Sequence, residues 1–387
     1  MNSVNRAAPL RVGYDAHALL APPGALTGKG VQLGNLLGRY AQRFIGFAPP
    51  GENNSNLPLV QQGSPRYNIW EQTSLPALLR RTKIDVFLAP YNTAPLYIPS
   101  STRLVLVVHD TILQENFKHG NLRRDLYDGY RRFLIRRAAR RAEVILTVSE
   151  FSKQEILSYF PGSRVEVIPC TLAASWFNRR AVVPADQRDE YLFMVTSPVP
   201  HKNFDRALQA YAKYAASSPH PLKLRIGGMA RAGERYRETL TALGVAGLVQ
   251  FEPRLSDQEL QALYRHAGAV LVPSLMEGFG IPMLEAMSVG TPVIASYATS
   301  LREVGGDAPY YFDPRNVEEM AAAIKTVSGD AALRQDMASR SLAEAERYHP
   351  AVVQAKVDEF WARIANITPE PAINPGMATT AAGDAQF

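Results

Sequence analysis

Cysteine is almost absent from this sequence: among 387 residues, Cys170 is the only one. A single thiol excludes an intramolecular disulfide and a zinc site built from cysteines, and it is typical of proteins in a reducing compartment. Long apolar runs are missing as well, because the longest, such as residues 104–108, have strand length and fall far short of the ~20 residues that span a bilayer. Residues 1–9 contain no apolar core of a signal peptide. We therefore expect a cytoplasmic protein.

A strong excess of charge of one sign is also lacking, since the net charge is +6. The basic residues are nevertheless unevenly spread. Residues 122–141 are predicted to form a long amphipathic helix with basic positions at Arg123, Arg124, Arg131, Arg132, Arg136, Arg137, Arg140 and Arg141. Such a helix is either a solvated face with snorkelling side chains or a docking surface for anionic lipid on the inner face of a membrane, for which the candidates are Arg123, Arg124, Arg131 and Arg132. The stretch lacks the interleaved aromatic side chains of a nucleic-acid binder, so no nucleic-acid partner is expected.

Apolar runs of strand length alternate with segments of helical periodicity along most of the chain, which predicts an α/β protein with parallel sheets covered on both faces. The strand-like runs are residues 10–15, 44–47, 84–88, 104–108, 144–148, 165–168, 191–196, 222–226, 249–251, 270–272 and 292–295. A polar stretch without periodicity, residues 178–190, separates two groups of them and is the expected hinge. We predict domains at residues 1–185 and 186–348, a C-terminal helix within 349–367 and a disordered tail at 368–387.

The most informative stretch follows the strand-like run that begins at Ala269. It passes through the loop Glu277-Gly-Phe-Gly280 and opens a helix with Pro282 near its first position, where a missing N–H costs nothing. Free N–H groups at a helix start bind anions, and the helix dipole favours a phosphate there. Gly278 and Gly280 allow the backbone to approach a ligand closely because they carry no β-carbon.

Two carboxylates accompany this phosphate-binding loop. Glu277 lies at the end of the strand, and Glu285 is expected on the first turn of the following helix. Both can face one crevice at the carboxyl ends of the strands, where open α/β sheets bind ligands. Carboxylates suit the vicinal hydroxyls of a ribose or a sugar, because each oxygen accepts charge-assisted hydrogen bonds. The predicted ligand is therefore a nucleotide-sugar.

Glu277 and Glu285, with seven residues between them, and the following Ala286-Met-x-x-Gly-x-Pro-Val-Ile-Ala-Ser296 resemble the signature of the retaining glycosyltransferases of family 4, the group 1 glycosyltransferases. The resemblance implies the GT-B fold, in which two Rossmann-like, doubly wound parallel-sheet domains face each other across a cleft and a C-terminal helix crosses back to the first domain. It also implies retaining transfer of a hexose from a nucleotide-sugar, with a mild preference for GDP-mannose. The implied acceptor is a glycan or a lipid-linked saccharide in surface polysaccharide synthesis.

The same resemblance assigns individual residues. His109, at the end of a strand, matches a histidine that contacts the transferred sugar, and Glu277 holds that sugar; these two are the catalytic candidates. Lys202 matches a lysine that binds the donor phosphates, and Glu285 matches the ribose ligand. The donor-binding candidates are Gly28, Gly30, Lys202, Asn203, Arg254, Leu255, Gly278, Phe279, Gly280, Ile281 and Glu285.

Several of these assignments have simpler alternatives in the sequence itself. Gly28 and Gly30 are equally well explained as turn glycines, His109 as a residue that caps its strand, and Lys202 as a surface lysine. The sequence departs from the family at Thr196-Ser197, where many relatives have Gly-Arg, so a second cation for the diphosphate has to come from elsewhere, with Arg231 or Arg235 as candidates.

No Asp-x-Asp motif is placed to bind a metal, so we expect no cofactor beyond the donor. Two other functions stay open at this point. One is a nucleotide-sugar epimerase of the same architecture, which needs acid and base groups around the sugar rather than an acceptor groove. The other is a nucleotide-sugar-binding protein without turnover, which the missing arginine near Ser197 favours.

Overall fold

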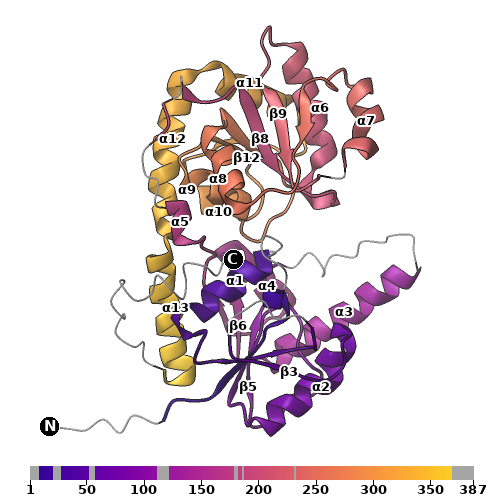
Figure 1. The fold of residues 1–387 in the computed structure, drawn as a ribbon, viewed down its shortest axis with the longest axis vertical. Coiled ribbons are helices and arrows are strands. Elements are labelled where there is room, and N and C mark those ends of the chain that lie inside the picture. The colour runs from indigo at the N-terminus through magenta and orange to yellow at the C-terminus, as the bar shows by residue number, and fades with distance from the viewer. Residues whose placement is uncertain are drawn as a thin grey trace, which may run out of the picture. The chain divides into compact units, whose positions relative to one another are not determined.

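The computed structural model describes residues 8–20, 28–51, 57–110, 122–177, 182–184, 187–230 and 232–367. The chain divides into two compact units, which are coloured along the sequence in Figure 1: unit 1 contains Met1–Cys170 and Ala351–Phe387, and unit 2 contains Thr171–Pro350. The division therefore lies at Cys170/Thr171 rather than at the 185/186 boundary derived from the sequence. The tail at 368–387 and much of the expected hinge lie outside the described residues.

The segment that follows Cys170 belongs to unit 2 because its side chains pack there. Thr171 donates a hydrogen bond to the carbonyl of Tyr348 at 2.5 Å. In the short helix α5 (Ala174–Phe177), the Trp176 ring meets Tyr264 edge to face at 5.9 Å. The segment just before the expected hinge at 178–190 thus carries buried aromatic contacts.

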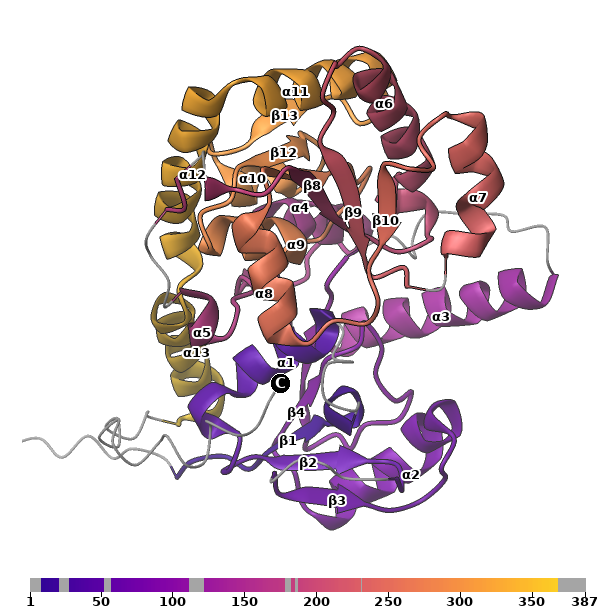
Figure 2. The same cartoon turned by 45° about the horizontal axis from the view of Figure 1, so that its top comes forward.

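Unit 1 is built on a seven-stranded parallel sheet in the order β3-β2-β1-β4-β5-β6-β7. Figure 2 shows β1, β2 and β3 side by side. The order reverses between β1 and β4, which makes this the topological switch point of a doubly wound sheet. The strands are β1 (Val12–Asp15), β2 (Ile45–Ala48), β3 (Leu59–Gln61), β4 (Val86–Ala89), β5 (Arg103–Val107), β6 (Val144–Thr147) and β7 (Val165–Val167).

Helices cover both faces of this sheet, because alternate strand residues point to opposite sides. Val86 and Leu88 of β4 pack in a core with α1 (Gly28–Leu37) and α13 (Pro350–Ala365). Phe87, between them, packs in the opposite core. That core is formed with α2 (Tyr67–Arg81), α3 (Leu122–Arg141) and α4 (Glu150–Tyr159).

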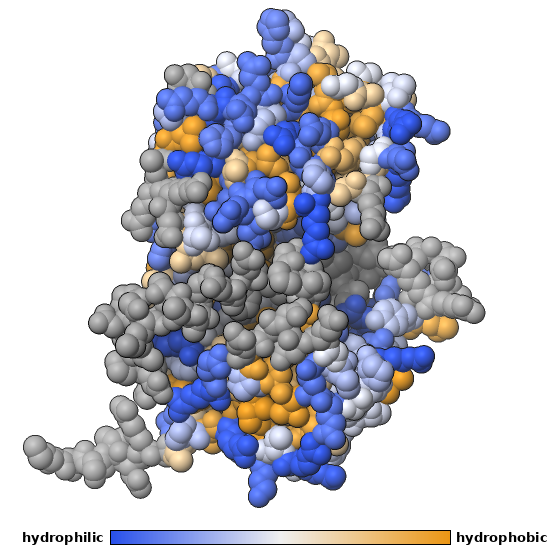
Figure 3. Space-filling view, viewed as in Figure 1, coloured by the Kyte–Doolittle hydropathy of each residue, from blue (hydrophilic) through white to orange (hydrophobic). Residues whose placement is uncertain are grey.

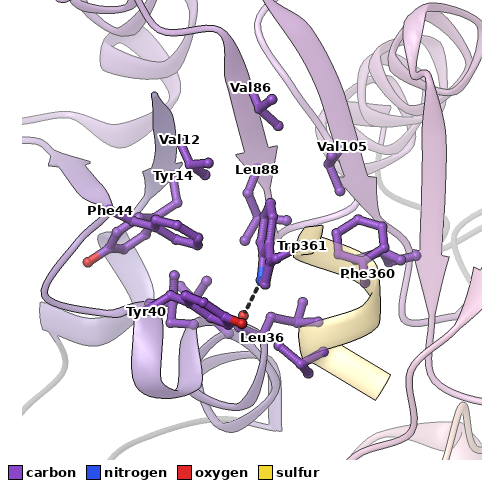
Figure 4. Close-up of a cluster of buried hydrophobic side chains, with 14 of the residues drawn as sticks. Val12, Tyr14, Leu36, Tyr40, Phe44, Val86, Leu88, Val105, Phe360 and Trp361 are labelled. Atoms are coloured by element: carbon purple, nitrogen blue, oxygen red, sulfur yellow. Dashed lines mark hydrogen bonds between the residues drawn. The ribbon is translucent and has the colours of Figure 1, made fainter. Parts of the chain in front are cut away.

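The C-terminal helix α13 completes unit 1 through Trp361. Its ring is fully buried and meets Phe44 edge to face at 4.8 Å, and its Nε1 donates to the carbonyl of Leu36 at 2.8 Å (Figure 4). A buried indole usually finds such a partner, because an unpaired N–H in a core is costly. Residues from the end of the chain therefore fill the core built by its beginning.

Unit 2 contains a six-stranded parallel sheet in the order β10-β9-β8-β11-β12-β13, with its switch point between β8 and β11. The strands are β8 (Tyr191–Val195), β9 (Lys223–Gly227), β10 (Val249–Phe251), β11 (Ala269–Val272), β12 (Val293–Ser296) and β13 (Tyr310–Phe312). The helices are α6 (Phe204–Ala216), α7 (Gly233–Ala242), α8 (Asp257–His266), α9 (Ile281–Ser288), α10 (Leu301–Gly305), α11 (Val317–Gly329) and α12 (Ala331–Ala345). Two sheets of this order confirm the prediction of two Rossmann-like domains.

Arg188 fixes two of these helices at their C-terminal ends. Its guanidinium is buried and donates to the carbonyls of Arg265 and Ala267 at the end of α8, at 2.9 and 3.1 Å, and to that of Gly290 beyond α9 at 2.6 Å. The last carbonyls of a helix have no partner within the helix, and a cation at this end interacts favourably with the negative end of the helix dipole. Arg188 therefore links the C-terminal end of α8 to the segment that follows α9.

The surface drawn in Figure 3 alternates between hydrophilic and apolar areas on both units. Within the described residues, no helix combines the length and the apolar composition needed to cross a bilayer.

Candidate active site

The loops at the switch point of unit 2 bring Lys202 and Glu277 together. Lys202 follows β8 and Glu277 follows β11, the two neighbouring strands at which the order reverses. The Lys202 ammonium donates to Glu277 Oε1 at 2.6 Å, and the Ser274 hydroxyl donates to the same oxygen at 2.7 Å. Only 20% and 12% of the two charged side chains are exposed. The sequence-predicted phosphate ligand and sugar ligand are thus direct partners in the ligand-free protein.

The backbone of Glu277 is tied down on both sides. Its N–H donates to Thr299 Oγ1 at 3.0 Å, and its carbonyl accepts from the Ser300 hydroxyl at 2.9 Å. Two residues earlier, the N–H of Leu275 donates to the carbonyl of His201 at 2.8 Å, which links the loop after β11 to the loop that carries Lys202. Held in this way, the carboxylate is preorganised for a ligand.

The helix α9 begins directly beyond this carboxylate. Gly280 has φ +98°, a conformation that favours glycine, and a β-carbon there would lie 2.5 Å from Leu301 Cδ2. Pro282 occupies the first turn, and no acidic residue is present there. The Phe279 side chain is buried against Tyr348, with ring centroids 5.3 Å apart, so only its main chain is available to a ligand.

Glu285 lies half-buried on α9 and accepts a hydrogen bond from the Tyr264 hydroxyl at 2.7 Å. Burial raises the pKa of Glu285 to about 7, and the charge of Asp257 adds to this rise. The Tyr264 hydrogen bond and the charge of Lys202 act in the opposite direction. Lys202 therefore lies within electrostatic reach of both predicted carboxylates, which share one side of the unit.

The side chain of Asn203 is engaged by the protein itself. Its backbone is left-handed, with φ +58°, and its buried amide Nδ2 donates to the carbonyls of Pro273 at 3.0 Å and Pro314 at 2.7 Å. Its Oδ1 accepts from Arg206 at 3.1 Å. The Asn203 side chain thus connects the loop that carries Lys202 to the loops at Pro273 and Pro314.

The remaining donor-binding candidates of unit 2 lie near the ends of other strands. Arg254, which is exposed, and Leu255 lie between β10 and α8, whose N-terminus is closed by a capping box of Ser256 and Glu259. Of the two candidates for a second cation, Arg231 lies outside the described residues. Arg235 lies over the ring of Tyr236, at 5.7 Å from its centroid.

In unit 1, His109 is buried at the end of β5 and is held from two sides. Its backbone N–H donates to Asn92 Oδ1 at 3.0 Å, and its ring Nε2 lies 2.9 Å from the carbonyl of Pro90. Because a carbonyl only accepts, Nε2 carries the proton and Nδ1 is left as an acceptor. Burial lowers the pKa of His109 to about 4, and the charge of Lys29 adds to this effect. The imidazole of His109 is therefore neutral near neutral pH.

Gly28 and Gly30 lie in the first turn of α1 rather than in a loop before it. Between them, Lys29 is half-buried, and burial lowers its pKa; the charge of Asp110 opposes this effect and that of Arg131 adds to it. Sequence reasoning assigned no role to Lys29, although its position between two glycines at a helix start was visible. It lies within electrostatic reach of His109.

The Arg-rich helix α3 differs in detail from the prediction. Arg131 and Arg132 are half-buried, and Arg131 lines a cavity instead of facing outward with the exposed arginines. The side chains of Arg123 and Arg124 lie outside the described residues. Of the apolar residues of α3, Leu134 is buried, whereas Leu126 and Phe133 are 65% and 55% exposed. The helix therefore carries apolar side chains on its open surface.

Comparison with known proteins places these observations in a family. Residues 177–343 match the family described as "Glycosyl transferases group 1", and residues 40–174 match "Glycosyltransferase Family 4". The chain belongs to the group 1 glycosyltransferases of the family 4 type. One relative in this family, O-antigen chain mannosyltransferase B of Escherichia coli, is 32% identical over 217 residues, which cover 54% of this chain and 57% of that protein. The chain spans about half the length of the curated relatives that it matches.

Similarity to solved structures confirms the GT-B fold. Sucrose-phosphate synthase from Thermosynechococcus elongatus superimposes with a TM-score of 0.73 at 16% identity, over 92% of this chain and 99% of that one. HepE of Anabaena, in complex with UDP-glucose, has a TM-score of 0.70 at 18% identity, over 92% and 100% of the two chains. Among the residues that the structure describes, no group of three or more His, Cys, Asp or Glu side chains is arranged to hold a metal ion.

Proposed function

We propose that this group 1 glycosyltransferase transfers a hexose, with retention of configuration, from a nucleotide-sugar to a glycan or lipid-linked saccharide in surface polysaccharide synthesis. The observation that carries the proposal is the Lys202–Glu277 ion pair at the switch point of unit 2, with Glu285 within reach of the same lysine. One cation between two carboxylates, beside the start of α9, matches a diphosphate flanked by two polyols. The name of the Escherichia coli relative supports mannose as the transferred sugar, and GDP-mannose is the donor that the sequence resemblance favours.

In this proposal, donor binding exchanges the partners of Lys202. The diphosphate takes the ammonium and the N–H groups at the start of α9, which together meet the charge that develops on the leaving group. Glu277, released from Lys202, accepts hydrogen bonds from hydroxyls of the transferred sugar. Glu285 accepts from the ribose. Before the donor binds, Glu277 is therefore paired with Lys202.

Retention follows if the acceptor attacks on the face from which the diphosphate leaves. The departing phosphate then takes the acceptor's proton, so the chain need not supply a general base of neutral pKa. The neutral imidazole of His109 fits this scheme, because its lowered pKa suits a hydrogen-bond acceptor at Nδ1 better than a proton carrier.

A panel of nucleotide-sugars tests the proposal. Thermal shifts should be largest for the true donor, since a ligand at 100 times its Kd stabilises by about 2.7 kcal/mol. NMR of the transfer product with GDP-mannose should show the α-anomer retained. Release of an epimerised nucleotide-sugar would instead identify an epimerase, and stabilisation without hydrolysis or transfer would identify a binding protein.

We also infer that α3 contacts anionic membrane, with Arg123 and Arg124 as the basic candidates. The exposed side chains of Leu126 and Phe133 add apolar area to this helix surface, which basic residues alone do not supply. The protein should pellet with phosphatidylglycerol vesicles at low salt, and a Leu126→Ser/Phe133→Ser variant should pellet less. Equal recovery with neutral phosphatidylcholine vesicles would contradict the electrostatic part.

A further inference from the structure

A cavity lies in unit 1. Its volume is about 180 Å³, and its walls include Tyr67 and Glu71 of α2, Tyr91 and Thr93 after β4, and Tyr130 and Arg131 of α3. The strand order reverses between β1 and β4, and ligands of doubly wound sheets bind beyond the carboxyl ends of the strands at this point. The position is thus that of a ligand site.

The carboxylate of Glu71 is buried in the wall but keeps capacity for a ligand. Thr93 Oγ1 donates to Oε1 at 2.7 Å, and Gln72 Nε2 donates to Oε2 at 2.9 Å. Tyr67 is a third hydrogen-bond partner of this carboxylate. Because the two oxygens together accept about four hydrogen bonds, capacity for one ligand hydroxyl remains. Burial raises the pKa of Glu71, and the hydrogen bonds from Thr93 and Gln72 and the charge of Arg131 oppose this rise. One negative and one positive group leave the cavity without a net charge to attract an anion.

The aromatic walls are fixed before any ligand binds. The Tyr67 hydroxyl donates to Asp15 Oδ2 at 2.8 Å, and the Tyr67 ring stacks on His17 at 4.5 Å. The Tyr91 hydroxyl accepts from the N–H of Ala18 at 2.5 Å. Tyr130, in contrast, is 42% exposed although it lines the cavity. Rigid tyrosines with one open ring combine apolar faces with polar edges, which suits a ligand of the same mixed character.

We propose that this cavity binds one neutral sugar ring, with its hydroxyls on Glu71 and its apolar face against the tyrosines. Resting on the proposed function, the ring is a unit of the acceptor saccharide. The cavity volume of about 180 Å³ lies below the roughly 300–1,000 Å³ of sites for drug-sized ligands. The cavity therefore takes a single ring rather than an oligosaccharide or a nucleotide.

Binding of neutral methyl glycosides to the full chain tests this site. The probes are the methyl α-glycosides of mannose, glucose, galactose and N-acetylglucosamine, observed by saturation-transfer NMR and titration. Tyr130→Ala should weaken the best binder roughly tenfold or more, and so should Glu71→Gln, which removes a charged acceptor. Tyr159→Ala is the matched control, because Tyr159 is 41% exposed on α4 of the same unit. Its affinity should equal that of the wild type.

Three results would overturn the assignment: no binding of any of the four glycosides, equal binding in Tyr130→Ala and wild type, or tighter binding of mannose 6-phosphate than of the methyl mannoside. The donor reaction is measured separately on the same proteins. If the wild type neither binds nor turns over any nucleotide-sugar but binds the glycoside through Tyr130 and Glu71, the proposed function fails and the sugar site stands. If transfer proceeds and the acceptor KM is unchanged in both variants, the function stands and the sugar site fails.

Discussion

Replacement of Lys202 by methionine tests the proposed exchange of partners. Its ammonium lies 2.6 Å from Glu277 Oε1, and both side chains are largely shielded from water. A hydrogen bond to a charged group contributes about 1.5–3 kcal/mol, and 1.4 kcal/mol is tenfold in affinity. If the diphosphate takes over this contact, Lys202→Met should weaken binding of GDP by roughly 10- to 150-fold.

Glu277→Gln should behave in the opposite way towards the free nucleotide. Glu277 competes with the incoming diphosphate for Lys202. Loss of the Glu277 charge should therefore leave the affinity for GDP unchanged or raise it. The same variant should lower kcat for transfer, because the hydrogen bonds to the sugar weaken. The affinity for the nucleotide thus depends on Lys202, whereas the rate of sugar transfer depends on Glu277.

Isothermal titration with GDP and GDP-mannose separates the two effects. Lys213→Met is the control, because Lys213 pairs with Glu318 at 2.9 Å in the same unit but on an exposed surface, and such pairs contribute little. Equal GDP affinity in Lys202→Met and Lys213→Met would refute the exchange. A loss of GDP affinity in Glu277→Gln as large as that in Lys202→Met would refute it as well.

Three further predictions concern the stability of unit 2. Burial raises the pKa of Glu285 from 4.5 to about 7, so between these pH values the folded chain keeps a proton that the unfolded chain loses. The free energy of unfolding should therefore fall by roughly 3 kcal/mol as the pH rises from about 4.5 to about 7. Glu285→Gln should flatten the dependence of Tm on pH. Gly280→Ala should cost about 1–3 kcal/mol through its positive φ, whereas Gly247→Ala, which meets open space, should be near neutral in denaturant unfolding. Arg188→Ala should cost roughly 3 kcal/mol by removing three buried hydrogen bonds to carbonyls, while the exposed Arg237→Ala changes the unfolding midpoint little; equal midpoints would contradict the bridging role.

The alternation of strand and helix was predictable from the sequence because most strands are buried on both faces. Runs such as residues 104–108 are continuous apolar segments, and β5 lies there. The sequence reading missed β3 and β13, two strands of three residues at the edges of their sheets. The other two edge strands, β7 and β10, are equally short and were predicted, so strand length and edge position alone do not explain why β3 and β13 were missed.

The donor site was predictable in part for a similar reason. Glu277, Gly280 and Glu285 are close in sequence, so their spacing already places them around one helix start. The contact of Lys202 with Glu277 spans 75 residues and depends on how β8 and β11 pair. The structural use of Asn203 was hidden as well, since its partners are carbonyls of distant loops.

The sugar cavity of unit 1 left almost no mark in the sequence. Its residues come from α2, from the segment after β4 and from α3, and no spacing links them. The pair Tyr67 and Glu71, four apart on one helix face, was the only local signal. Arg131 was misread for the same reason, because helical periodicity does not tell which face of a polar helix meets a cavity.

A crystal structure of the protein with GDP-mannose tests the central claim most directly. The account predicts the diphosphate on Lys202 and on the N–H groups at the start of α9, with a ribose hydroxyl within about 2.5–3.0 Å of a Glu285 carboxylate oxygen. A nucleotide bound elsewhere, with Lys202 still paired to Glu277 and Glu285 bonded to Tyr264 alone, would contradict it.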